Sequence, residues 1–146
     1  MTNTMNNNIR NILAVIIGLV MGGYVNMYLV MKGPVPEGLD MDKIVDFIPL
    51  FETKHYVMPL VGHAVGTFVG AIVASIIAAS YQFRLAMLVG VIFFISGILN
   101  AIMLQFAWLP AIIDISFAYI PMAWLGSLVG SFFSKKLNLD LNQDYY

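Results

Sequence analysis

Four long apolar stretches dominate this sequence and restrict it to a helical fold that spans a membrane. They occupy residues 11–31, 56–80, 85–108 and 110–133. Each is long enough to cross roughly 30 Å of hydrocarbon, for which about 20 helical residues are needed. Only 10% of the 146 residues are charged, whereas an ordinary soluble domain has about 25%. We therefore predict an all-α integral membrane protein with a single membrane domain over residues 1–146.

The short connections between the later stretches predict an up-and-down arrangement. SYQFR (80–84) joins the second stretch to the third, and AWLP (107–110) joins the third to the fourth. Helices joined by so few residues must lie beside each other in antiparallel orientation. A longer loop, residues 32–55, joins the first stretch to the second. We expect an antiparallel four-transmembrane-helix bundle.

Basic residues are distributed unevenly between the two ends of the predicted bundle. The loop 32–55 contains three lysines and five acidic residues. At the other end lie Arg10, Arg84, Lys135 and Lys136. Because basic residues favour the cytoplasmic side of a membrane, we expect both termini in the cytoplasm and the loop in the periplasm of a bacterium. The expected location is the bacterial inner (cytoplasmic) membrane, with multi-pass topology.

The loop 32–55 has a helical pattern of its own. Gly38 and Asp40 are typical of a turn followed by a helix N-cap. Apolar residues then recur at helical spacing before Pro49, at Met41, Ile44, Val45 and Ile48. This pattern predicts a short amphipathic helix, which we expect to fold back as a lid over the outer mouth of the bundle. The alternatives are a helix that lies on the membrane surface and a connector without a function of its own.

Glycines recur at every fourth residue in the second stretch, at Gly62, Gly66 and Gly70. Helices in lipid approach each other closely only where side chains are small. The other stretches carry further glycines of this kind: Gly18, Gly22, Gly90, Gly97, Gly126 and Gly130. We expect all of them to mark packing between helices of one chain, and a dimer interface is the alternative.

Each apolar stretch carries one polar side chain at a similar depth on the side of the loop. With a rise of about 1.5 Å per residue, the distances from the outer helix ends are about 9, 10, 12 and 6 Å for Asn26, His63, Asn100 and Asp114. Since lipid offers no hydrogen bonds, mutual contact is the most stable arrangement for these groups. We expect His63 to share the face of the glycines, to point into the bundle and to pair with Asp114.

The fourth stretch contains a proline that is expected to bend it. Pro121 has no N–H, so the carbonyl of Phe117 loses its helical partner. On a straight helix Asp114 would point away from Gly126 and Gly130, and the bend is expected to turn it towards the other helices.

Three more polar residues are expected next to the layer of polar side chains described above. Thr67 is expected on the inner side of His63, and Glu52 and His55 on the outer side.

The polar layer has two interpretations. It is either a structural network that fixes the helix register, or the lining of a pocket for a small polar ligand, a proton, a metal ion or a lipid headgroup. The chain has no cysteine, no zinc-type H-x-x-x-H or H-E-x-x-H spacing and no G-x-S-x-G turn. We therefore expect no metal and no cofactor, and we do not favour an enzyme. A net charge of −1 gives no reason to expect a nucleic-acid partner.

Four segments carry a resemblance to a known family: GPVPEGLD (33–40), HYVMPLVGHAVGTFVGA (55–71), GILNAIM (97–103) and AYIPMAWLG (118–126). On these segments the sequence resembles a family of uncharacterised small four-span bacterial inner-membrane proteins, associated mainly with Bacteroidetes. The resemblance implies the membrane topology described above, and it implies no activity.

Three classes of function are compatible with these patterns. The favoured one is a binding or accessory protein of the lipid bilayer, working in a larger membrane complex or as a homo-oligomer. The alternative is a small oligomeric transporter or channel, and the third is a membrane enzyme that uses His63 and Asp114 as acid and base. Conduction requires a polar lining across the full depth of the membrane. The stretches offer almost no polar side chains on the cytoplasmic side of Thr67, so we do not expect a monomer to conduct.

Overall fold

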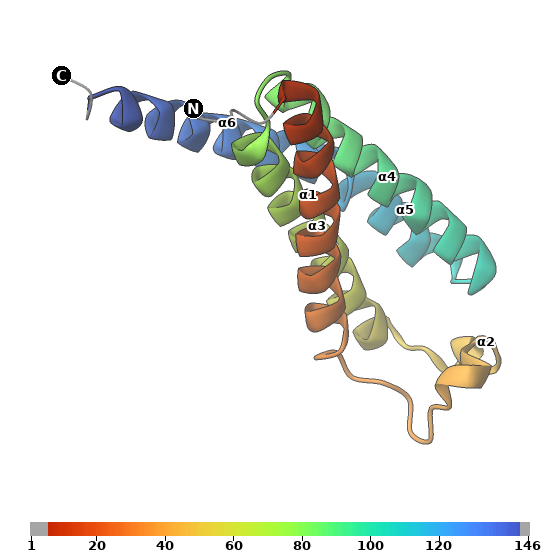
Figure 1. Ribbon diagram of the computed structural model, residues 1–146. Coiled ribbons are helices and arrows are strands. Elements are labelled where there is room, and N and C mark those ends of the chain that lie inside the picture. The colour runs from red at the N-terminus through yellow and green to blue at the C-terminus, as the bar shows by residue number, and fades with distance from the viewer. Residues whose placement is uncertain (1–5, 144–146) are drawn as a thin grey trace.

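All regular secondary structure in the described part of the chain is helical (Figure 1). This computed structural model describes residues 6–143, except for the side chains of residues 41 and 138–143. The helices are α1 (Asn7–Val30), α2 (Ile44–Phe47), α3 (Thr53–Ile77), α4 (Gln82–Met103), α5 (Trp108–Phe117) and α6 (Ile120–Gln143). Within these residues, four spans are long and apolar enough to cross a membrane, namely α1, α3, α4 and the segment Trp108–Leu137. The predicted all-α membrane fold is confirmed.

The fourth span consists of two helices instead of one bent helix. The first, α5, ends at Phe117, and α6 begins at Ile120 after two residues in a bend. Pro121 explains this break, because it has no N–H to donate to the carbonyl of Phe117 and its ring would clash with the preceding turn. The break allows the two helices to take different directions. The second, α6, continues to Gln143, well beyond the predicted end at residue 133.

The start of α1 and the end of α6 lie toward one end of the molecule, and the loop with α2 lies at the other (Figure 1). At the end with the termini, Arg10 Nε donates a hydrogen bond of 2.6 Å to the carbonyl oxygen of Ile77. The side-chain oxygen of Asn11 accepts from the backbone N–H groups of Ala79 and Ser80. These bonds satisfy backbone groups at the end of α3 that have no partner within their own helix. They hold the start of α1 against the end of α3, so the two helices are antiparallel.

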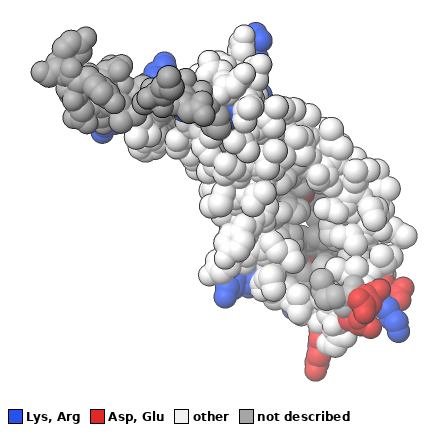
Figure 2. Space-filling model, in the orientation of Figure 1, with Lys and Arg blue, Asp and Glu red and all other residues white. Residues whose placement is uncertain are grey.

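Charged side chains gather at the two ends of the molecule, and a broad belt between them is uncharged (Figure 2). Large apolar side chains lie exposed on this belt, for example Val20 on α1 and Ile102 on α4, which are 64% and 68% exposed. In water such a surface would be unfavourable, whereas in hydrocarbon it needs no cover. The surface therefore agrees with a helical bundle that faces lipid.

The central helix of the bundle is α3, which packs against α1, α4 and α6. A Cβ atom built on Gly22 of α1 would lie 2.6 Å from the carbonyl oxygen of Gly66 of α3. A Cβ atom on Gly66 would likewise lie 2.7 Å from the carbonyl oxygen of Gly22. No space remains for a methyl group, so the two backbones are in direct contact.

The other packing glycines lie against neighbouring helices in the same way. They are Gly18, Gly62 and Gly70 between α1 and α3, Gly90 and Gly97 of α4 against Ala123 and Tyr119, and Gly126 and Gly130 between α6 and α3. Each of these contacts joins two segments of one chain. The glycines therefore serve packing within the bundle.

The loop between α1 and α3 begins its helical part where the sequence indicates. Gly38 has a φ of +73°, a conformation that suits glycine. Asp40 then accepts a hydrogen bond of 3.0 Å from the backbone N–H of Asp42 and caps the first turn. The helical part is short, because α2 has only four residues between the 3-10 turns Met41–Lys43 and Ile48–Leu50. Pro49 lies in the second of these turns, where the predicted helix was expected to stop.

Candidate functional site

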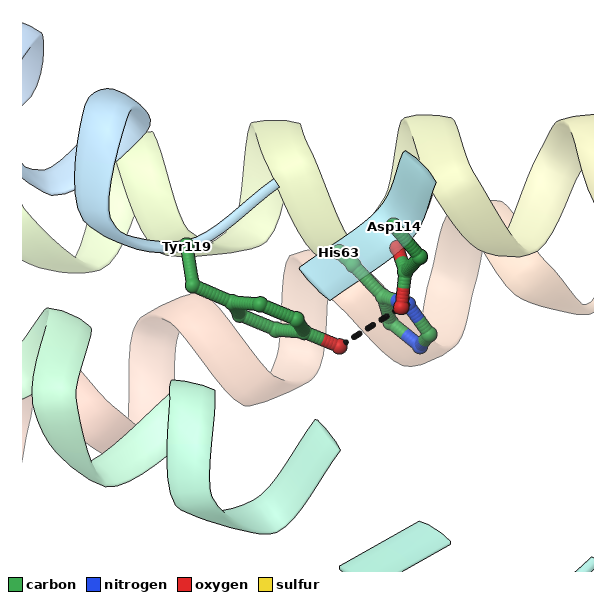
Figure 3. A network of polar contacts seen from close by, with 3 residues as sticks. All are labelled: His63, Asp114 and Tyr119. Carbon is green, nitrogen blue, oxygen red and sulfur yellow. Dashed lines mark hydrogen bonds and ion pairs between the residues drawn. The ribbon is translucent and has the colours of Figure 1, made fainter. Parts of the chain in front are cut away.

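Three polar side chains meet inside the bundle (Figure 3). His63 comes from α3, Asp114 from α5, and Tyr119 from the bend between α5 and α6. Nδ1 of His63 lies 2.9 and 2.8 Å from the two carboxylate oxygens of Asp114. The hydroxyl group of Tyr119 donates a hydrogen bond of 2.9 Å to Oδ2 of the same carboxylate. The rings of His63 and Tyr119 are also stacked, with centroids 5.7 Å apart. We call these three residues the polar network.

The break in the fourth span positions two members of this network. Asp114 lies on α5, whose direction is independent of α6, and Tyr119 lies in the bend between them. The Tyr119 side chain passes over Gly97 of α4, where a Cβ atom would overlap its ring. Only a residue without a side chain fits there, so Gly97 makes room for the tyrosine. As a result Tyr119 is 3% exposed and its hydroxyl group reaches Asp114.

The charge of Asp114 decides which of these atoms donate. When Asp114 is ionised its carboxylate only accepts, so the Tyr119 hydroxyl and Nδ1 of His63 are then both donors to it. The second ring nitrogen of His63, Nε2, points away from Asp114 (Figure 3). Among the described residues, Asn26 Oδ1 is the one buried side-chain nitrogen or oxygen that lacks a partner. Nε2 makes no hydrogen bond with these residues either, and since it is not among the buried unpaired atoms it keeps some exposed surface.

His63 lines a cavity of about 380 Å³ between α3, α4 and α5. Its walls are mostly apolar, and its lining residues with polar groups are His63, Asp114, Asn100, Thr53 and Tyr56. A second cavity of about 230 Å³ lies under the loop and is lined by loop residues that include Pro34, Leu39 and Ile44. Both cavities share five lining residues: Phe51, Pro59, His63, Asn100 and Phe106. The loop thus forms part of the wall beside His63, and its role as a lid stays a prediction.

Asn100 and Thr67 lie differently with respect to the network. The Asn100 side chain lines both cavities and makes no hydrogen bond with any described residue. Its amide group is therefore free to bind something in the cavity. Thr67, one helical turn from His63 on α3, is 1% exposed and does not line either cavity. It belongs to the packed interior.

Asn26 is not brought to the other three members of the expected layer, which corrects the prediction. It packs against Gly62 and Gly66 at the contact between α1 and α3, where its Oδ1 atom is buried. His63 faces α5, on a different side of α3 from these glycines. Similar depth is not sufficient for contact, because α3 lies between the two groups. The expectation that His63 shares the face of the glycines is wrong for the same reason.

Glu52 and His55 pair with each other at the start of α3 and not with the network. The ring nitrogen Nδ1 of His55 accepts a hydrogen bond of 2.8 Å from the Glu52 backbone N–H, and the Glu52 side chain caps the His55 backbone in return. The ammonium group of Lys54 lies 2.9 Å from the Glu52 carboxylate. This hydrogen-bonded ion pair lowers the pKa of Glu52 below its ordinary value of 4.5. His55 is buried and lines the second cavity, whereas Glu52 is exposed.

Sequence reasoning missed two groups at this site. One is Tyr119, whose position two residues before a helix-breaking proline is a signal that the sequence does contain. The other is an aromatic wall, in which the rings of Phe51 and Phe106 each lie 5.7 Å from Tyr56. Edge-on and tilted contacts at this distance are favourable for aromatic rings. These three residues line the larger cavity at the end of the bundle where the loop lies.

The half of the bundle near the termini contains more polar groups than expected. Ser75, Ser127 and Ser134 are buried there. The Ser127 hydroxyl donates to the carbonyl of Trp124, and Ser134 accepts from the side chain of Gln82. The hydroxyl groups of Ser127 and Ser134 are thus used in contacts within the protein. They are buried groups that contribute to the packing of this half of the bundle.

The fold and the site define a multi-pass helical membrane protein with a polar network beside a cavity of ligand size. Among the described residues, no group of three or more His, Asp or Glu side chains lies close enough to hold a metal ion. Comparison with protein-family models, curated proteins and solved structures found no match for this chain. The function is therefore argued from the geometry of the site.

Proposed function

We propose that this is an inner-membrane binding protein whose larger cavity holds a small amphipathic molecule. The observation that carries the proposal is the cavity of about 380 Å³, with apolar walls and the polar network on one side. Small-molecule sites typically have volumes of about 300–1,000 Å³, mostly apolar walls and a few polar groups that orient the ligand. A molecule with an apolar body and one polar end matches this lining.

The free hydrogen-bonding groups favour a binding site over a purely structural network. A structural network needs partners for all its polar atoms, because unpaired buried groups are costly. The Asp114 carboxylate has such partners in His63 and Tyr119. Nε2 of His63 and the amide of Asn100 have none within the described protein, and both residues line the cavity. These two groups are available to a ligand.

Orientation follows from the distribution of basic residues. Arg10, Arg84, Lys135 and Lys136 lie at the end of the bundle with the termini, and the loop with its five acidic residues lies at the other end. Under the positive-inside rule the termini are cytoplasmic, and the loop and both cavities lie towards the periplasm. The ligand would then enter from the outer leaflet or from the periplasm. Resemblance to a four-span bacterial family supports the same placement.

Native purification tests the proposal directly. We expect mass spectrometry of an organic extract to find one amphipathic compound that is enriched in the purified protein relative to the total lipid. The variant Ala101→Phe places a large side chain in the cavity wall and should lose this compound. Ile102→Phe is the matched control, because the neighbouring side chain is 68% exposed on the outer surface.

The outcome of this comparison is decisive if both variants melt like the wild-type protein in detergent. Equal retention of the compound by Ala101→Phe and Ile102→Phe would show that the cavity is not its site. The same purification would reveal a partner protein or a second copy, which the accessory-subunit hypothesis predicts.

A further inference from the structure

We infer that the ligand of the larger cavity is a neutral lipophilic alcohol whose hydroxyl group binds Nε2 of His63. The inference rests on the proposed function and adds the chemical class of the ligand. It depends on three observations, which are the hydrogen bonding of the His63 ring, the absence of lysine and arginine from the described cavity lining and the free amide of Asn100.

The first observation concerns the His63 ring. With Nδ1 directed at the Asp114 oxygens and donating to the ionised carboxylate, the neutral ring presents Nε2 as an acceptor, and the protonated ring presents it as a donor. A hydroxyl group both donates and accepts, so it can bind Nε2 in either state. An ether or ester oxygen only accepts, and an ammonium group only donates. A hydroxyl group is therefore the best partner for this nitrogen.

The second observation concerns charge. Among the residues that the structure describes, no lysine or arginine lines either cavity, whereas Asp114 lines the larger one. A phosphate or carboxylate head group would lie beside the Asp114 carboxylate with no lysine or arginine to balance the two negative charges, which is strongly unfavourable in a low-dielectric site. An ammonium group would compete with His63 and Tyr119, which already bind both carboxylate oxygens. The lining therefore selects a neutral polar group.

The third observation concerns Asn100. Its side chain lines the same cavity as His63 and has no partner among the described residues. The amide supplies two N–H donors and one oxygen acceptor. A ligand hydroxyl group that donates to His63 Nε2 is left with lone pairs for an Asn100 N–H. Apolar residues such as Leu60, Leu109 and Ile113 then surround the hydrocarbon part of the molecule.

A competition experiment tests this inference. The full-length protein in nanodiscs is photolabelled with a diazirine derivative of decanol, and the labelled peptides are identified by mass spectrometry. Unlabelled decanol, decanoate, decylamine and decane are then added as competitors at equal concentration in the bilayer. We expect labelling of the cavity wall on α4 and α5, and decanol should compete about tenfold better than the other three, which corresponds to one hydrogen bond.

Variants separate this inference from the proposed function. Asn100→Leu removes a side chain that makes no bond within the described protein, so it should fold, and it should reduce the advantage of decanol over decane. His63→Phe keeps an aromatic ring but removes Nε2, and it should abolish that advantage. Ala101→Phe should prevent labelling of the cavity wall altogether.

The possible results have different meanings. If Ala101→Phe prevents labelling but the four competitors act equally, the cavity binds amphipathic molecules and the alcohol inference is wrong. Stronger competition by decanoate or decylamine also overturns the inference, because it shows selection for a charge. If Ala101→Phe leaves the labelling unchanged, the proposed function fails together with the inference.

Discussion

Two neighbouring glycines of α1 should respond in opposite ways to the same substitution. Gly22 faces α3, and a Cβ atom there would lie 2.6 Å from the carbonyl oxygen of Gly66 and 2.9 Å from the ring of Phe93. Gly23 is the next residue, and a Cβ atom there would meet nothing within 4 Å. The structure therefore predicts that Gly22→Ala destabilises the protein and that Gly23→Ala does not.

The magnitude follows from the lack of space at Gly22. Ordinary contacts of a Cβ atom begin at 3.4 Å, so α1 and α3 would have to separate locally by about 0.8 Å to accommodate the new methyl group. Overpacking of this kind typically costs about 1–3 kcal/mol. Both substitutions also replace glycine by alanine inside a helix, which stabilises the helix by about 1 kcal/mol. Because the helix term is common to both variants, their difference in stability should be about 1–3 kcal/mol.

Unfolding in mixed detergent micelles by increasing fractions of sodium dodecyl sulfate, followed by circular dichroism, measures this difference. We expect Gly23→Ala to be as stable as the wild-type protein or slightly more stable, and Gly22→Ala to unfold at a lower fraction of denaturing detergent. Equal stability of the two variants would refute direct backbone contact between α1 and α3. A difference that depends on protein concentration would instead indicate that Gly22 lies at an interface between two copies.

Three further predictions address the network, the topology and the loop. Tyr119→Phe removes the hydrogen bond to Asp114 and should cost about 0.6–1.5 kcal/mol in the same unfolding assay, and no loss would show that this bond does not form. In intact cells an impermeant maleimide should label Asp42→Cys in the loop and leave Lys136→Cys unlabelled, and the reverse pattern would invert the proposed orientation. The pKa of Glu52 is lowered in the folded protein, so its ion pair with Lys54 stabilises the fold above the unfolded pKa of this carboxyl group and is lost as the pH falls through the lower folded value. Glu52→Gln should remove this acid-dependent part of the melting curve, and a curve identical to that of the wild-type protein would contradict the pairing.

The sequence by itself determined the helical membrane fold and its main packing contacts. The length and hydropathy of the apolar stretches were sufficient to predict the membrane-spanning helices, because a hydrocarbon layer requires long helices whose backbone groups are hydrogen-bonded. The spacing of Gly62, Gly66 and Gly70 was sufficient to identify α3 as a closely packed helix, since close approach in lipid depends on small side chains. The sequence also predicted that Asp40 caps a helical turn and that Pro121 disrupts the fourth span, because both effects depend on residues close in sequence.

Only the tertiary structure decided which polar groups meet. Depth along a helix can be counted from the sequence, but the side of the bundle that a residue faces depends on how its helix is rotated against its neighbours. Asn26 and His63 share a depth and yet lie on different sides of α3. The break at residues 118–119 separates the direction of α5 from that of α6, so the position of Asp114 could not be calculated from α6. Tyr119 reaches Asp114 because Gly97, distant in sequence, leaves space for its ring, and such a contact exists only in the packed molecule.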